Sequence, residues 1–326
     1  TFMKISDRVY GELDVSEPVL LDLLGSPSLL RLKDIDQAGY PKPHFPGWHS
    51  RYEHSVGVCL LLCKYGAPIE EQIAGLIHDV SHSAFSHCID YVLAEGTEGD
   101  QSHQDNVFDE YVRESELPGI LEKYGMDTNY ILTDAHFPLK EQDLPDLCAD
   151  RIDYSLREAM VFGEIRDANY FLENLTAVEG RWVFRNFEVA RRYAELFLRL
   201  SDVYYAGLPT AIMFRTVGDY LRHSLTKKYI SEDDLYTTDS VLLAKIAPHL
   251  RNDERLTLLY DRMNMEISVR NDPNDYDAEV LCKSRAVDPL CYDNGVVSRV
   301  SDLESNWKTI VVEKNKSKRY FLKFER

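Results

Sequence analysis

The ten residues from His78 to His87 constrain this chain more than any other stretch, because they hold three imidazoles and a carboxylate. His78 and Asp79 are adjacent, and His82 lies four residues beyond His78. At helical spacing these side chains lie on one side of a helix and can reach a single ion. Either the fold brings further metal ligands to this polar stretch, or the stretch lies on the surface and is hydrated.

The simpler interpretation of the same run is a surface helix with a hydrated polar face. From Ile73 to Val80 the apolar residues fall in one narrow sector and the polar residues fall opposite, as in any amphipathic helix. A His-Asp dipeptide alone is therefore a weak signal. Ligands elsewhere in the chain would decide between the two interpretations.

Length and composition predict a folded, soluble protein of more than one unit. The chain has 326 residues, 44% of them hydrophobic and 28% charged, which allows one large body with a smaller appended unit. Its net charge of −18 disfavours duplex DNA or RNA as a partner, although a small anionic substrate stays possible where cations gather.

The sequence also predicts a location and excludes a membrane partner. Apolar runs such as Val58–Cys63 are too short to span a bilayer, and the first fifteen residues lack a secretory core. Six cysteines without a CxxC pair fit a reducing compartment, so we expect a cytoplasmic protein.

Helical signals dominate the first 265 residues and predict a mostly α fold. Ser50 has the form of an N-cap, Pro68 suits the first turn of the helix that carries His78, and Ala94 to Asp105 reads as a loop before His103. A short hairpin is expected around Glu179-Gly180. The helices expected are 50–66, 68 through the His78 run, 145–162, 188–205 and 210–229.

The composition changes near residues 271–275, which resemble a boundary. Residues 309–312 and 320–324 read as strands. We therefore predict a body over residues 1–267 and a small α+β subdomain over residues 268–326.

Four side chains from separate helices are candidates for one metal site: His54, the His78-Asp79 pair and Asp150. Two imidazoles and two carboxylates suit a divalent ion such as Mn, Fe, Co, Ni, Zn or Mg. Such a set leaves coordination positions for water and a phosphate oxygen. The spacing H…HD…D is the signature of a known superfamily.

The chain resembles the HD superfamily of metal-dependent phosphohydrolases, and within it the deoxynucleoside triphosphate triphosphohydrolases of the SAM-and-HD-domain type. The similarity is clear over about residues 20–160 and weaker to 230. The resemblance implies an HD-type helical bundle that holds a metal between helices. Six blocks carry it in the family's order: residues 31–37, 45–47, 50–57, 74–79, 85–87 and 150–154.

The resemblance also implies roles for individual residues. Metal ligation falls to His54, His78, Asp79 and Asp150, and catalytic roles fall to His82, His87, Asp90 and His103. We expect His103 or His87 to be the general acid, with Asp90 orienting it. His82 is expected to contact phosphate or to act as a second group in line with the reacting bond.

Substrate contacts implied by the resemblance are Gln37, Arg51, Arg151, Tyr154 and Glu158. The two arginines stand where the family binds phosphate, for which a planar guanidinium is well suited. Glu158 stands where those enzymes commonly have Asp, which changes the fine geometry of the sugar contact.

Tyr204 and Tyr205 lie near a family tyrosine that closes the pocket, but the pattern around them departs from the family's and favours a core role. Gly25, Leu30 and Lys33 replace the residues that bind an activating guanine nucleotide in regulated members. That allosteric site is therefore expected to be absent. A helical homodimer is the assembly left open.

The first prediction is hydrolysis of a dNTP to deoxynucleoside and triphosphate, with one divalent ion and a second Mg arriving on the substrate phosphates. A phosphatase or phosphodiesterase acting on nucleoside monophosphates or another phosphorylated metabolite is the enzymatic alternative. A nucleotide-sensing HD scaffold without turnover is the non-enzymatic one. The partner expected in each case is a small nucleotide or phosphorylated molecule.

Overall fold

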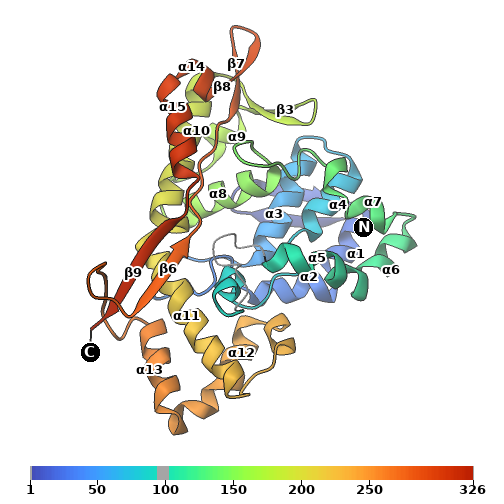
Figure 1. Cartoon of the computed structure of the whole chain (residues 1–326). Coiled ribbons are helices and arrows are strands. Elements are labelled where there is room, and N and C mark those ends of the chain that lie inside the picture. Colours follow the sequence, from blue (N-terminus) through green and yellow to red (C-terminus); the bar gives the residue numbers. More distant parts are fainter. Residues whose placement is uncertain (1, 94–102, 326) are drawn as a thin grey trace.

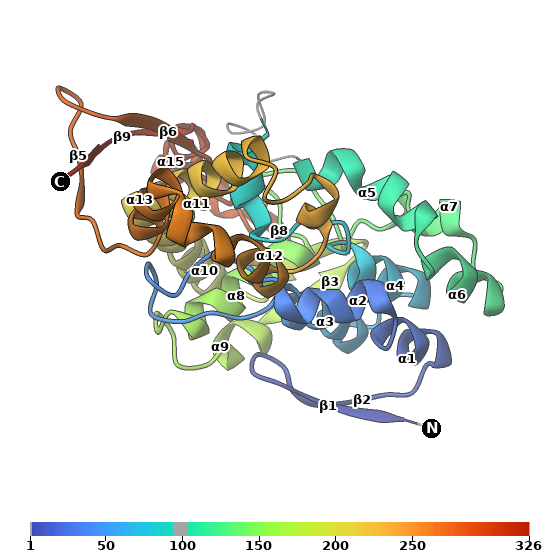
Figure 2. The ribbon, with the colours of Figure 1, turned by 90° about the horizontal axis from the view of Figure 1, so that it is seen from below.

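The computed structural model describes residues 2–93 and 103–325 and confirms the mostly α class (Figure 1). Within these residues the strands form three small sheets of two, four and three strands. The first is the hairpin β1 (Met3–Asp7) and β2 (Gly11–Val15), which runs along one edge of the molecule (Figure 2).

Helices α3 and α4 form the centre of the first half of the chain and pack closely on each other. Ser50 caps α3 as predicted, because its hydroxyl accepts a hydrogen bond from the Glu53 amide. The helices of this half are α1 (Pro18–Leu24), α2 (Pro27–Arg31), α3 (Arg51–Lys64), α4 (Ile69–Ile77), α5 (His103–Glu114), α6 (Leu117–Lys123), α7 (Thr128–Ile131) and α8 (Ala149–Val161).

Among the described residues, the second half adds the two long predicted helices and five shorter ones. Gly163, with φ of 79°, follows the end of α8 as expected of a helix stop. The remaining helices are α9 (Asn169–Leu172), α10 (Phe187–Leu200), α11 (Leu208–Thr226), α12 (Asp239–Ile246), α13 (Glu254–Met263), α14 (Val300–Leu303) and α15 (Ser305–Lys314).

The predicted hairpin is present as β3 (Leu175–Val178) and β4 (Arg181–Phe184), with positive φ at both turn residues, Glu179 and Gly180. Strand β7 (Leu290–Asp293) pairs in parallel with β4 and antiparallel with β8 (Val296–Arg299). The third sheet has the order β5 (Val269–Asn271), β9 (Lys318–Phe324), β6 (Ala278–Cys282). The division of the chain at residue 268 stays a prediction. Strand β7, from the predicted C-terminal subdomain, pairs with β4 of the predicted body.

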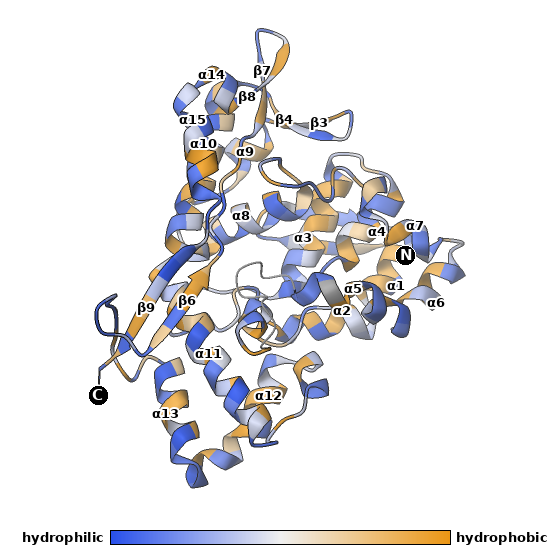
Figure 3. Cartoon of the chain, viewed as in Figure 1, coloured by the Kyte–Doolittle hydropathy of each residue, from blue (hydrophilic) through white to orange (hydrophobic). Residues whose placement is uncertain are grey.

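Two hydrophobic clusters hold the molecule together. One gathers residues of α3, α4, α8 and α10, and the other gathers residues of α11, α13, β6 and β9. Bands of hydrophobic and hydrophilic residues alternate along α11 and α13 in Figure 3, as expected of helices that bury one face. The cavity described below takes wall residues from both clusters.

One predicted strand is wrong. Residues 309–312, Thr-Ile-Val-Val, favour a strand by composition but lie inside helix α15. Trp307 is buried and donates its indole hydrogen to the Val287 carbonyl at 2.9 Å, and Ile310 and Val311 follow on the same helix face against the core. Tertiary packing overrides local propensity here. The other predicted strand, residues 320–324, is confirmed by β9.

The histidine run is also less helical than predicted. Helix α4 ends at Ile77, so His78 caps it, and Asp79 and His82 lie in the turns that follow. Residues 103–105 of the loop expected up to Asp105 are helical, because α5 begins at His103. Residues 94–102 lie outside the described residues. Helix α8 begins at Ala149, later than the expected start at 145.

No helix of the described part of the chain is long and apolar enough to cross a bilayer. All six cysteines are free thiols, and only Cys63 is exposed. The buried thiols fill space in the core as small apolar groups.

Gly57 allows α3 and α8 to approach each other, and its replacement tests this packing. A Cβ at Gly57 would lie 2.1 Å from Nη2 of Arg157 and 2.2 Å from Oδ1 of Asp153, both buried. We expect Gly57→Ala to lower the free energy of unfolding by about 2 to 3 kcal/mol through overpacking. Urea denaturation followed by circular dichroism measures this loss.

Gly119→Ala is the matched control, because a Cβ at this position in α6 would meet nothing within 4 Å. It should gain about 0.5 to 1 kcal/mol from the better helix propensity of alanine. Equal stability of Gly57→Ala and the unmodified chain would contradict the close approach of α3 and α8.

Candidate active site

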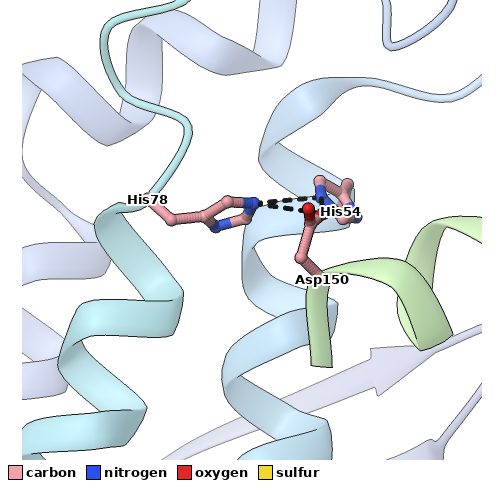
Figure 4. Close-up of side chains that lie close together, drawn as sticks. All are labelled: His54, His78 and Asp150. Carbon is pink, nitrogen blue, oxygen red and sulfur yellow. Dashed lines mark hydrogen bonds and ion pairs between the residues drawn. The ribbon is translucent and has the colours of Figure 1, made fainter. Parts of the chain in front are cut away.

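Three side chains from three helices meet at one point (Figure 4). Nε2 of His54, on α3, lies 3.2 Å from Nε2 of His78, at the end of α4. Oδ1 of Asp150, in the first turn of α8, lies 3.0 Å from the His54 nitrogen and 3.4 Å from the His78 nitrogen. The structure thus brings together residues that are 96 positions apart in the sequence, from 54 to 150.

A hydrogen bond at Nδ1 of each imidazole ring determines which nitrogen of that ring carries the hydrogen. Nδ1 of His54 lies 2.7 Å from a carboxylate oxygen of Asp153, and Nδ1 of His78 lies 2.7 Å from the Gly75 carbonyl oxygen. Both oxygens only accept, so each Nδ1 carries the hydrogen. In the neutral rings both Nε2 atoms therefore present lone pairs, and these face each other and the Asp150 oxygen.

Three acceptors at such distances repel one another unless a cation lies among them. A proton on Nε2 of His54 can supply the same positive charge: burial opposes the charged ring, yet hydrogen bonds to Asp150 and Asp153 raise the pKa of His54 to about 10. The residues therefore fit a divalent metal ion, with imidazole nitrogens and carboxylate oxygens as ligands.

Asp79 adds a fourth candidate ligand. Its Oδ1 lies 3.4 Å from Nε2 of His78 and 3.4 Å from Nε2 of His82. Its Oδ2 accepts a hydrogen bond from Nη1 of Arg51 at 2.5 Å, and both side chains are buried. Arg51 also donates to the Ser86 hydroxyl and the Gln37 carbonyl, so in this structure it fixes Asp79 and the following loop.

A buried network of charged side chains contacts His54 at Nδ1, on the side away from the metal-ligand cluster. Asp153 accepts hydrogen bonds from His54, from the Tyr10 hydroxyl at 2.8 Å and from Arg157 at 2.9 Å. Arg157 in turn contacts Asp7 of the β1–β2 hairpin at 3.0 Å. Although burial acts in the opposite direction, the Arg157 guanidinium and His54 hold the pKa of Asp153 below its ordinary value.

Of the predicted catalytic group, His82 and His87 lie on the cavity wall with their rings 5.1 Å apart. Burial and the nearby Arg51 charge lower the pKa of His82, so this ring is neutral. Nδ1 of His87 lies 3.2 Å from Oδ2 of the buried Asp90, which is the geometry of an imidazole oriented by a carboxylate.

His103 lies elsewhere. Its side chain is absent from the described cavity lining, and its Nε2 is 3.0 Å from the Tyr236 hydroxyl. Its backbone amide donates a hydrogen bond to Oδ1 of Asp90 at 3.1 Å. Of the two residues predicted as general acid, His87 lines the described cavity, and the role of His103 stays a prediction.

The predicted substrate residues share one cavity of about 590 Å³ that opens onto the metal ligands. Burial raises the pKa of Glu158 to about 7, so this group can carry a proton near neutral pH. Arg151 uses Nη1 to bond the Gln142 and Asp146 carbonyls and is one of the residues that line the cavity. The five predicted residues on the wall are Gln37, Arg51, Arg151, Tyr154 and Glu158.

Sequence reasoning missed several residues of the site. Asp153 could have been found, because it lies one helical turn after Asp150 on the same helix. Lys140 and Glu141 line the cavity from the segment before α8, and Lys283 and Arg285 line it from the segment after β6. Their contribution depends on tertiary contacts that no local pattern reveals.

Comparisons with known proteins agree with this geometry. A family model described as the HD domain matches residues 51–158. The protein YdhJ of Bacillus subtilis, whose function is uncharacterised, is 37% identical over 294 residues, which cover 89% of each chain. The chain belongs to the HD domain family of metal-dependent phosphohydrolases, as the sequence predicted.

Two further relatives are similar over shorter stretches. The metal-dependent phosphohydrolase cns2 of Cordyceps militaris is 40% identical over 61% of this chain and 58% of its own length. The human deoxynucleoside triphosphate triphosphohydrolase SAMHD1 is 30% identical over 39% of this chain and 23% of its own length. This chain thus spans little more than half of the first of these proteins and under a quarter of the second.

Solved structures share the fold over the whole chain. A phosphohydrolase from Bacteroides thetaiotaomicron superposes with a TM-score of 0.72 and 16% identity over 100% of both chains. A hypothetical protein from Aquifex aeolicus has a TM-score of 0.72 and 18% identity over 99% of this chain and 96% of its own. At this identity the likeness establishes the architecture alone.

Asp153→Asn tests whether the buried network serves the metal site. The change removes the charge that polarises His54, so we expect the affinity for Mn²⁺ to fall about 10- to 100-fold. Isothermal titration calorimetry on the folded variant measures this. Tyr10→Phe is the control, since it removes one hydrogen bond to Asp153 and leaves the carboxylate, and should change affinity by less than about fivefold. Unchanged Mn²⁺ affinity in folded Asp153→Asn would contradict the account.

Proposed function

We propose that the chain hydrolyses a deoxynucleoside triphosphate to a deoxynucleoside and inorganic triphosphate. The observation that carries the proposal is one cavity whose wall includes His87, which contacts Asp90, together with three candidate metal ligands and three predicted substrate residues. These six wall residues are His78, Asp79, Asp150, Gln37, Tyr154 and Glu158. The relatives named as dNTP triphosphohydrolases support the same reaction.

The cavity offers separate surfaces for the parts of such a substrate. Phe45, Phe162 and Tyr204 form an aromatic wall, with Phe162 and Tyr204 stacked at 4.4 Å. An aromatic wall suits a base or sugar face. Cationic side chains on the wall suit the phosphate oxygens: Lys140, Arg151, Lys283 and Arg285. Arg51 also lies on the wall, where it bonds Asp79.

In the proposed reaction water adds to the α-phosphorus, the bond from that phosphorus to the 5′ oxygen breaks, and the 5′ oxygen takes up a proton. His54, His78, Asp79 and Asp150 would hold a divalent ion, which supplies Lewis acidity and makes a water more acidic. His87, oriented by Asp90, is our choice of proton donor, because it combines a carboxylate partner with a place on the wall.

A phosphatase or phosphodiesterase acting on nucleoside monophosphates is the second candidate. The cavity wall also holds many carboxylates, which disfavour a highly charged triphosphate unless divalent cations accompany it. These carboxylates are Asp79, Asp105, Asp134, Glu141, Asp143, Asp150 and Glu158. A second Mg bound with the substrate phosphates remains part of the first proposal.

Product analysis decides between the candidates. The purified chain, incubated with Mn²⁺ and separate dNTPs, dNMPs and cyclic nucleotides, should release deoxynucleoside and triphosphate from a dNTP, as resolved by ion-exchange chromatography. Excess EDTA should abolish turnover, and His78→Ala should lower it by at least about 100-fold, because the cluster loses a ligand.

His249→Ala is the matched control, since this histidine stacks on Tyr229 outside the described cavity lining and should leave turnover unchanged. Release of single phosphate from monophosphates would select the second candidate. Tight binding without turnover would instead show a nucleotide sensor.

A further inference from the structure

The loop that carries His82 and His87 has a backbone that requires outside support. It follows α4 as a series of turns and continues into the 3₁₀ helix η2 (Ser86–Tyr91). Phe85 and Ser86 have φ of 60° and 48°, in the left-handed region that costs non-glycine residues about 1 kcal/mol or more. We call residues 79–87 the histidine loop and ask what holds it.

The side chain of Arg31, the last residue of α2, binds the backbone of the histidine loop. Nη2 donates to the carbonyl oxygens of Val80 and His82, both at 2.7 Å. Nη1 of the same guanidinium donates to the carbonyl oxygens of Tyr236 at 3.2 Å and Thr237 at 3.0 Å. The planar guanidinium of Arg31 thus links the histidine loop to residues 235–239, a segment about 150 positions later in the chain.

Residues 235–239 contact the loop directly as well. Oδ1 of Asp239 accepts a hydrogen bond from the Phe85 amide at 2.7 Å, and the Leu235 carbonyl accepts one from the Ala84 amide at 2.8 Å. Oδ2 of Asp239 accepts from the Asp36 amide at 2.8 Å, next to the cavity residue Gln37. The strained residue Phe85 is therefore held by a side chain from α12.

This support lies outside the part of the chain that the HD domain model covers, residues 51–158. Asp239 is not needed as the cap of its own helix, because Thr238 is the N-cap of α12 and accepts from the Val241 amide. Both oxygens of the Asp239 carboxylate instead face segments that build the site.

We propose that Arg31 and Asp239 are positioning residues, which fix the backbone of the histidine loop so that His82 and His87 face the substrate. They touch no reacting atom. Proton donation by His87 rests on the proposed function, whereas the support of the loop by Arg31 and Asp239 does not.

Hydrogen exchange tests the holding of the loop without any turnover. In Asp239→Ala the amides of Ala84 and Phe85 should exchange at least about tenfold faster, because Phe85 loses its acceptor. Asp234→Asn is the matched control: it lies in the same segment, but its carboxylate bonds Ser231 and Lys245, so loop exchange should stay unchanged. Unchanged exchange in Asp239→Ala would overturn the proposal.

A leaving-group comparison tests the consequence for His87. Thymidine 5′-triphosphate releases a 5′ oxygen that needs a proton, whereas its analogue with sulfur in place of the 5′ oxygen releases a thiolate that does not. Asp239→Ala, like His87→Ala, should lower kcat at least about tenfold more for the oxygen substrate than for the sulfur analogue. A general loss of folded enzyme would lower both equally, and that result would overturn positioning of the acid.

Conservative variants keep the test valid if Asp239→Ala does not fold. Asp239→Asn retains one acceptor and should give an intermediate exchange rate and an intermediate leaving-group effect, and Arg31→Lys should act similarly. If the unmodified chain cleaves neither the sulfur analogue nor any dNTP, the proposed function fails, while the exchange result still decides whether these residues hold the loop.

Discussion

The mutual repulsion of three acceptors is the constraint on which the rest of this structure depends. Asp153 and the Gly75 carbonyl fix the hydrogen on Nδ1 of His54 and His78, so the opposite nitrogens and the Asp150 oxygen converge with lone pairs. Such an arrangement is stable only with positive charge at its centre. The HD family to which the chain belongs uses a metal for this purpose, and the donor set here fits one.

Much of the surrounding fold keeps this cluster in place. Gly57 lets α3 approach α8 closely, and the space where a side chain would lie is filled by Arg157 and Asp153. Arg157 links the cluster to the N-terminal hairpin through Asp7, and Arg51 bonds both Asp79 and Ser86 of the histidine loop. The ligands are thus held by charged groups that are buried and paired, which makes the removal of one partner costly.

The sequence predicted most helices and the convergence of three candidate ligands, because both leave local signals. Ser50 is a recognisable cap, and His54, His78 and Asp150 stand in a pattern shared with a known family. Other features could not be predicted because long-range contacts decide them. Residues 309–312 are helical through the packing of Trp307, and α4 ends before His82, where Arg31 and Asp239 hold the turns. The contacts of His103 with Tyr236 and of Lys283 and Arg285 with the cavity likewise join distant parts of the chain.

Crystals of the chain grown with Mn²⁺, measured at the absorption edge of manganese, test the central claim most directly. We predict a strong anomalous peak among Nε2 of His54, Nε2 of His78 and Oδ1 of Asp150, about 2.0 to 2.3 Å from each and within reach of Asp79. A direct hydrogen bond between His54 and Asp150 with the anomalous peak elsewhere would contradict the claim, because the cluster would then be satisfied by a proton and would need no metal.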